Sequence, residues 1–195
     1  EELERNGSWR YANTYGRVWV PNSVPAGWAP YTNGRWAWDP LYGYSWVDYA
    51  PWGWAPYHYG RWVYPGYWAW APGPVLAAPF YSPALVAFFG VPGFSVGVGV
   101  GFGAVGWVPL GWGEPLIPWW GGVGFIGSPC WWGWGGPRVV NNVVINNNTV
   151  VNANTVNFYR NFNSPGGLVG VPKDQFTTAS LDRARLQNIS TDQLK

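Results

Sequence analysis

A short aromatic sequence occurs twice between residues 27 and 72, and this repetition constrains the fold more than any other feature of the chain. Residues 27–31 and 34–36 read GWAPY and GRW, and residues 53–57 and 60–62 repeat both at an offset of 26 residues. A degenerate copy, GRVWVP, precedes them at residues 16–21. A recurring sequence of fixed spacing indicates that one local structure is built more than once.

The segments around these repeats alternate aromatic or β-branched residues with small or polar ones, a pattern typical of half-buried strands. We therefore expect tandem β-hairpins and no long helix. The predicted strands are residues 8–11 and 17–20, residues 35–38 paired with residues 44–47, and residues 61–64 paired with residues 67–70 across a Pro65-Gly66 turn.

Turn residues punctuate the same region. Asn33-Gly34 is a hairpin signal, because both residues tolerate the positive φ of a type I′ turn. In the second copy Tyr59-Gly60 stands at the same place, so there only the glycine is expected to adopt a positive φ.

Arginines 17, 35 and 61 recur in register with the repeats. A guanidinium plane stacks well on an indole face, so we expect each to lie over a tryptophan. The alternative is a rim arginine at the start of a strand. The residues predicted to form this stacked set are Trp28, Arg35, Trp36, Trp38, Trp54, Arg61, Trp62, Trp68 and Trp70.

Two later segments suit strand pairing between molecules. Residues 95–103 alternate a large residue with glycine, which leaves one face of a strand bare for close packing; a flexible linker is the alternative. Residues 139–156 are rich in Asn and Val, which favours stacked strands with asparagine ladders; ordinary edge strands are the alternative. The predicted assembly residues are Val96, Val98, Val100, Phe102, Val143, Val144, Ile145 and Asn146.

These patterns predict an all-β chain with four regions. They are the aromatic hairpin repeats at 1–74, an uncharged Gly/Pro/Trp-rich region at 75–137, an Asn/Val-rich strand region at 138–172, and a tail at 173–195. The charged lead-in at residues 1–5 is expected to end a helix near Gly7. In the tail, Ser180 is a plausible N-cap for a short helix to Asn188.

Composition excludes several classes of partner. Charged residues are 10% of the chain and the net charge is +2, with no basic patch for nucleic acid. Residues 62–113 carry no fixed charge, but prolines and glycines interrupt every window long enough to span a membrane, so no transmembrane segment is expected. The single cysteine, Cys130, is predicted to be a buried apolar residue, with pairing between chains as the alternative.

No catalytic or metal-binding set is predicted, and hence no enzyme and no cofactor. His58 is the one histidine, and with one cysteine it does not make a zinc site of the usual kind. The carboxylates of the aromatic body are Asp39, Asp48 and Glu114, and nothing in the sequence brings a pair of them together.

Eight motifs of the chain together point to a known family. They are YGRVWVP (15–21), WAPY (28–31), GRWAWDP (34–40), YGYSWV (42–47), PWGWAPYHYGRW (51–62), SPALVAFFG (82–90), VGWVPLG (105–111) and VPKDQF (171–176). With these motifs the chain resembles a bacterial family of uncharacterised proteins known for YXWGXW repeats. Its members are often exported and are often found with an upstream FecR-like domain, so the resemblance implies an envelope or extracellular location and no particular reaction. The chain starts at Glu1 and contains no Met, which predicts a processed N-terminus or a piece of a longer product.

We therefore expect a structural, self-associating envelope or extracellular protein, the subunit of a homopolymeric filament assembled by strand addition. One alternative is a carbohydrate- or cell-wall-binding module with exposed Trp and Tyr faces; buried tryptophans would favour the structural role instead. Gly-Trp followed by Gly-any-Trp also resembles choline-binding cell-wall repeats, whose rings cage a quaternary ammonium. Another alternative is an envelope signalling accessory, by analogy with the FecR-like association.

Overall fold

The computed structural model describes residues 1–40, 43–73, 81–89, 104–114 and 159–177, together with Leu181 and Arg185. This part of the chain is all-β, as predicted, with short strands in three small antiparallel sheets. The helical elements described are short: α1 (Glu2–Asn6), α2 (Trp54–His58) and the 3-10 helix η2 (Lys173–Gln175).

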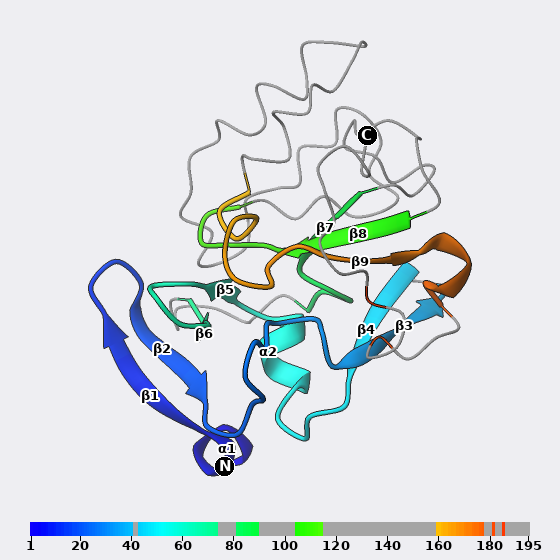
Figure 1. The fold of residues 1–195 in the computed structure, drawn as a ribbon. Helices are drawn as coiled ribbons and strands as arrows, with labels where there is room; N and C mark the ends of the chain where they lie inside the picture. Colours follow the sequence, from blue (N-terminus) through cyan, green and yellow to red (C-terminus); the bar gives the residue numbers. More distant parts are fainter. Residues whose placement is uncertain are drawn as a thin grey trace.

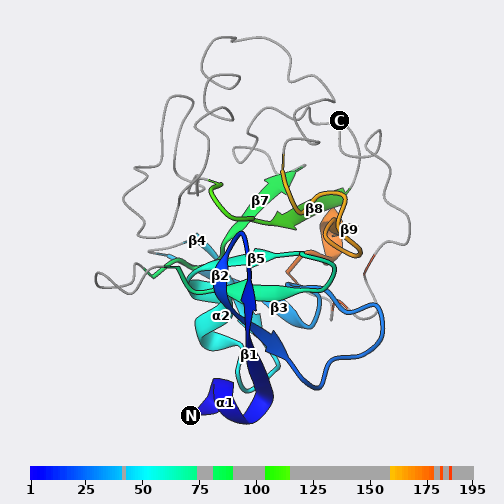
Figure 2. The same ribbon diagram turned by 90° about the vertical axis from the view of Figure 1, so that its left-hand side faces the viewer.

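The largest sheet has four strands in the order β1-β2-β6-β5. Figure 1 shows this sheet and the β3–β4 hairpin on opposite sides of α2, with the sheet of β7, β8 and β9 across the top. Figure 2 shows the β1–β2 hairpin in front of the β5–β6 pair. The strands are β1 (Gly7–Ala12), β2 (Gly16–Pro21), β3 (Gly34–Asp39), β4 (Gly43–Asp48), β5 (Arg61–Val63), β6 (Ala69–Ala71), β7 (Val86–Phe89), β8 (Ala104–Pro109) and β9 (Val169–Pro172).

The β3–β4 hairpin confirms the predicted pairing, with Trp36 opposite Trp46. The β5–β6 hairpin exists, but its predicted two-residue turn is wrong. Trp62 lies opposite Trp70, and residues 64–68 connect the two strands. The longer connection goes with a tertiary contact. Trp68 lies outside both strands, and its indole N–H donates to the carbonyl of Pro165 at 2.9 Å.

The prediction for Asn33-Gly34 is also wrong. Gly34 begins β3 and does not have a positive φ, while the carbonyl of Asn33 accepts from the amide of Tyr49 at 3.0 Å and closes the open end of the hairpin. In the second copy Gly60 does have a positive φ, of 69°. A positive φ therefore does not explain why both copies have glycine at this position.

The reason that both copies share is the close approach of a tryptophan ring. A Cβ atom on Gly34 would lie 2.5 Å from Cζ2 of Trp46, and one on Gly60 would lie 2.6 Å from Nε1 of Trp70. A Cβ on Gly7 would overlap the indole of Trp19 in the same way. Real Cβ atoms do not approach other atoms so closely, so the rings occupy the space of the missing side chains.

Three hairpins therefore share one geometry. In each, a glycine precedes the tryptophan of the first strand by two residues, and the indole of the paired tryptophan on the second strand packs on that glycine. The cross-strand pairs are Trp9–Trp19, Trp36–Trp46 and Trp62–Trp70. The prediction that the degenerate copy begins at residue 16 is therefore wrong. In the hairpin geometry, residues 7–9 on β1 correspond to residues 34–36 on β3.

The GWAPY halves of the repeat do not share one structure, contrary to the prediction. Residues 53–57 lead into and form most of α2, whereas residues 27–31 lie in turns and irregular backbone. Tyr31 has a φ of 61°, the one positive φ among the described non-glycine residues. The repeat equivalents Tyr31 and Tyr57 contact each other, with ring centroids 4.7 Å apart and the Tyr31 hydroxyl donating to the Tyr57 carbonyl at 2.9 Å.

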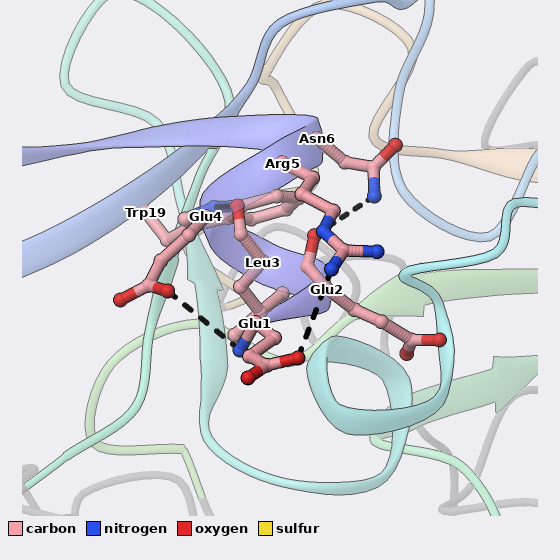
Figure 3. Close-up of polar contacts among 7 residues, drawn as sticks. All are labelled: Glu1, Glu2, Leu3, Glu4, Arg5, Asn6 and Trp19. Carbon is pink, nitrogen blue, oxygen red and sulfur yellow. Dashed lines mark hydrogen bonds and ion pairs between the residues drawn. The ribbon is translucent and has the colours of Figure 1, made fainter.

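The predicted helix end at residues 1–5 is confirmed as α1, but Gly7 is not a left-handed cap, because its φ is −164°. Instead Trp19 packs on Gly7 and its indole N–H donates to the carbonyl of Leu3 at 2.7 Å (Figure 3). This contact fixes α1 to the hairpin that follows it.

The predicted assembly strands at 95–103 and 139–156 lie outside the described residues, as does Cys130. Of the predicted helix at 180–188, the structure describes Leu181 and Arg185, and the amide of Arg185 donates to the carbonyl of Leu181 at 3.0 Å, the spacing of a helical turn. Strands β8 and β9, from the second and third predicted regions, pair with each other.

Candidate functional site

The predicted stacked set divides into a buried group and an exposed group. Trp36 and Trp62 are 2% and 1% exposed, and they share one apolar core with aromatic residues of all three sheets. Trp54 and Trp38 are 62% and 53% exposed. Of the remaining members, Arg61, Trp68 and Trp70 are buried, Trp28 is half-buried and Arg35 is exposed.

Arg61 and Arg35 occupy matching places in the repeat but not matching environments, so their predicted equivalence is wrong. Arg61 is buried, and its Nε and Nη2 donate to the carbonyl of Glu114 at 3.3 and 3.0 Å. Its Nη1 donates to the carbonyl of Gly60 at 2.7 Å. Burial lowers the pKa of Arg61. Arg35 is exposed on β3, as the rim alternative predicts.

Arg17 does lie over an indole, with its guanidinium carbon 4.5 Å from the ring centre of Trp9. Arg17 lies on β2, whereas Arg35 and Arg61 lie on the first strands of their hairpins. The predicted common register of the three arginines is therefore wrong. On the same hairpin Arg10 lies 5.2 Å from the ring centre of Tyr67.

Glu114 joins the buried arginine to the segment that begins at Tyr159. Its carboxylate accepts from the amides of Gly111 and Arg160 at 2.6 and 2.5 Å. Burial raises the pKa of Glu114, while these two hydrogen bonds act in the opposite direction. Asn161 completes the junction, donating to the carbonyls of Trp62 and Pro109 at 2.8 and 3.0 Å. The network satisfies buried polar groups and ties two sheets together, which is a structural role.

A second buried polar group lies at the end of β4. The carboxylate of Asp48 accepts from the indole of Trp46 at 2.9 Å and from the amide of Ala50 at 2.8 Å. Burial nevertheless raises the pKa of Asp48 to about 6. Burial, and then the charge of Asp48, raise the pKa of Tyr57.

Two of the exposed aromatic residues, Trp54 and Tyr81, lie at α2. Trp54 begins this helix, and its ring centre lies 5.3 Å from that of Tyr59 and 6.4 Å from that of Tyr81. Tyr81 stacks on His58 with ring centres 5.0 Å apart. No local sequence pattern marks Tyr81 or the contact that His58 makes with it, since the tertiary fold alone brings residues 58 and 81 together.

No group of three or more His, Cys, Asp or Glu side chains among the described residues is arranged to hold a metal ion. Within the same ranges, no helix is long and apolar enough to cross a membrane.

Residues 1–114 match a family model described as "Family of unknown function (DUF6600)". The match includes the three glycine–tryptophan hairpins, β7 and β8, and ends at Glu114, while β9 lies beyond it. No curated protein and no solved structure matches the chain. Because the matched residues are more than half of the 195-residue sequence, the chain belongs to the DUF6600 family, a family of unknown function.

Proposed function

We propose that this protein is a structural, self-associating component of the cell envelope or extracellular space, the subunit of a homopolymeric filament joined by strand addition. The observation that carries the structural part is the orientation of the hairpin tryptophans. Trp19, Trp36, Trp46 and Trp62 are each at most 2% exposed. Their indoles build a core, and they are not presented to a ligand.

Self-association is supported by the sheet edges. β1 is an edge strand that pairs with β2, and in the described part of the chain no strand lies on its other side. Its outward residues include exposed Arg10 and Tyr11, and Arg10 is its one charged residue. Soluble proteins usually protect such edges with more charge, because free N–H and C=O groups accept a strand from another molecule.

The donor strands in this proposal are the predicted assembly segments, 95–103 and 139–156. Donation of either segment to an open edge would satisfy backbone groups on both sides. The envelope location is supported by the resemblance to exported YXWGXW-repeat proteins.

Sedimentation velocity and negative-stain microscopy of the purified chain test this proposal. We expect species that grow with protein concentration and end in filaments. Val98→Lys and Val144→Lys place charge in the two assembly segments and should each abolish growth, while the near-ultraviolet circular dichroism of the tryptophan core persists. Val47→Lys is the matched control, because Val47 is 38% exposed on β4, outside these segments.

A compact monomer of 21.7 kDa at every concentration would contradict self-association. If filaments still grow in Val98→Lys and in Val144→Lys but do not grow in Val47→Lys, then segments 95–103 and 139–156 are not the strands that join the subunits. Both results would leave the buried tryptophan core as the structural description of the protein.

A further inference from the structure

We propose that Trp54, Tyr59 and Tyr81 form a binding platform for a neutral glycan chain. Trp54 is 62% exposed and Tyr81 is 38% exposed, although most aromatic residues of the described structure are turned inward. Tyr59 is half-buried between them and the core. Tyr11, Trp38 and Tyr49 are exposed as well, but Trp54 and Tyr81 come from separate segments and contact each other, with ring centres 6.4 Å apart. Exposed rings that group together in this way can mark a surface for binding.

The three rings come together from two separate segments. The rings of Trp54 and Tyr81 are stacked, with their planes 27° apart and their centres 6.4 Å apart. Tyr59 lies edge-on to Tyr81 at 6.1 Å and borders the pair. The result is a cluster of three tyrosine and tryptophan rings, with Trp54 as its most exposed member, which suits a flat ligand.

Hydrogen bonds beneath the rings hold this platform in place. Nδ1 of His58 bonds to the carbonyl of Ser82 at 2.7 Å, and the amide of Ser82 donates to the carbonyl of His58 at 3.0 Å. These two bonds fix Tyr81, the neighbour of Ser82, on the ring of His58. The amide of Tyr59 donates to the carbonyl of Ala55 at 3.0 Å and fixes the end of α2. Rings held before binding lose little conformational entropy when a ligand arrives.

The chemistry of the platform points to a sugar without charge. A pyranose ring presents C–H groups on its face, and these are attracted to the negative face of an aromatic ring while hydroxyls point outward. Residues 49–60 and 62–113, which carry the platform, contain no Asp, Glu, Lys or Arg. Burial lowers the pKa of His58, which disfavours a positive charge on the imidazole under Tyr81. These segments offer no counter-charge for an ionic ligand.

Titration calorimetry of the full chain with chitohexaose and with cellohexaose tests the platform, with choline chloride as a cationic probe. We expect at least one hexasaccharide to bind with a dissociation constant below about 1 mM. Trp54→Ala and Tyr81→Ala should each weaken binding by about tenfold or more. Trp38→Ala is the matched control, because Trp38 is 53% exposed on β3 and should leave binding unchanged. Trp54→Gln serves as a second variant if Trp54→Ala fails to fold.

The proposal is overturned if neither hexasaccharide binds at about 10 mM. It is also overturned if the Trp54 and Trp38 variants weaken binding equally, or if choline binds and both sugars do not. Sedimentation of the Trp54 variants separates this result from self-association, because loss of glycan binding should leave the assembly of the chain unchanged.

Discussion

The indole of Trp46 lies over Gly34 at the open end of the β3–β4 hairpin, in the space that a side chain at residue 34 would occupy. The same ring donates its N–H to Asp48 at 2.9 Å, so it is held both by packing and by a hydrogen bond. Trp19 on Gly7 and Trp70 on Gly60 repeat this arrangement, and their N–H groups donate to the carbonyls of Leu3 and Tyr59. A ring therefore excludes a side chain at the glycine of each hairpin, and at Gly34 and Gly60 the carbonyl oxygens of Val47 and Ala71 exclude it as well.

Gly34→Ala should destabilise the protein by about 1–3 kcal/mol, because the new methyl group overpacks a closed site. The methyl would meet the ring of Trp46 and the carbonyl oxygen of Val47. Urea unfolding, followed by tryptophan fluorescence, measures this difference.

A double-mutant cycle with Trp46→Leu shows whether the ring is the cause. Removing the ring should reduce the cost of Gly34→Ala without abolishing it, because the clash with the Val47 carbonyl remains. Equal costs of Gly34→Ala in both backgrounds would mean that Trp46 does not lie on Gly34.

Arg61→Ala should destabilise the protein by about 3 kcal/mol or more, because buried carbonyls of Gly60 and Glu114 lose their donors and a cavity is left. Arg35→Ala, the same substitution at the matching repeat position, should change stability by about 0.5 kcal/mol or less, as is usual at an exposed site. Denaturant unfolding of the two variants compares them directly, and similar effects would contradict the burial of Arg61.

Arg17→Ala should cost about 0.5–1 kcal/mol, the usual range for an exposed guanidinium over an indole. Arg17→Lys should restore part of this, since an ammonium is attracted to the ring but does not stack on it. Thermal unfolding of the two variants beside Arg35→Ala checks the prediction. A cost no larger than that of Arg35→Ala would show that the contact with Trp9 contributes nothing.

Asp48 should make the protein less stable as the pH rises from about 4 to about 6. Burial raises its pKa to about 6, so the folded protein holds this proton more tightly than the unfolded chain does. Glu114 acts in the same direction, because burial also raises its pKa, whereas His58 acts in the opposite direction, because burial lowers its pKa. The contribution of Asp48 is therefore the difference between the wild-type protein and Asp48→Asn. Urea unfolding at several pH values should give a flatter profile for the variant, and parallel profiles would contradict the shift.

The sequence was sufficient to predict the all-β class and the β3–β4 hairpin, because alternation and turn residues are local signals. It was not sufficient to separate Arg61 from Arg35, since both stand in the same GRW sequence. Their environments differ because Glu114, 53 residues away, covers one of them. The same holds for GWAPY, which leads into a helix at Trp54 and forms irregular turns at Trp28.

The glycine–tryptophan contacts were missed for a related reason. Asn-Gly before a strand is a common turn signal, so the local sequence predicts a positive φ at Gly34. The ring that excludes a side chain there comes from the opposite strand, and nothing in the local sequence marks it. The platform at Trp54 was only partly predictable, because Tyr81 reaches it through the pairing of residues 58 and 82.

The chemical shifts of the glycine Hα protons test the central claim most directly, namely that a ring lies on the glycine in three hairpins. A proton–carbon correlation spectrum of the ¹³C-glycine-labelled protein would resolve them. We predict that one Hα proton each of Gly7, Gly34 and Gly60 is shifted far upfield by the ring current of Trp19, Trp46 and Trp70. The Hα protons of Gly16 and Gly66, where a Cβ atom would meet nothing within 4 Å, should show ordinary shifts. Ordinary shifts for Gly7, Gly34 and Gly60 as well would contradict the account.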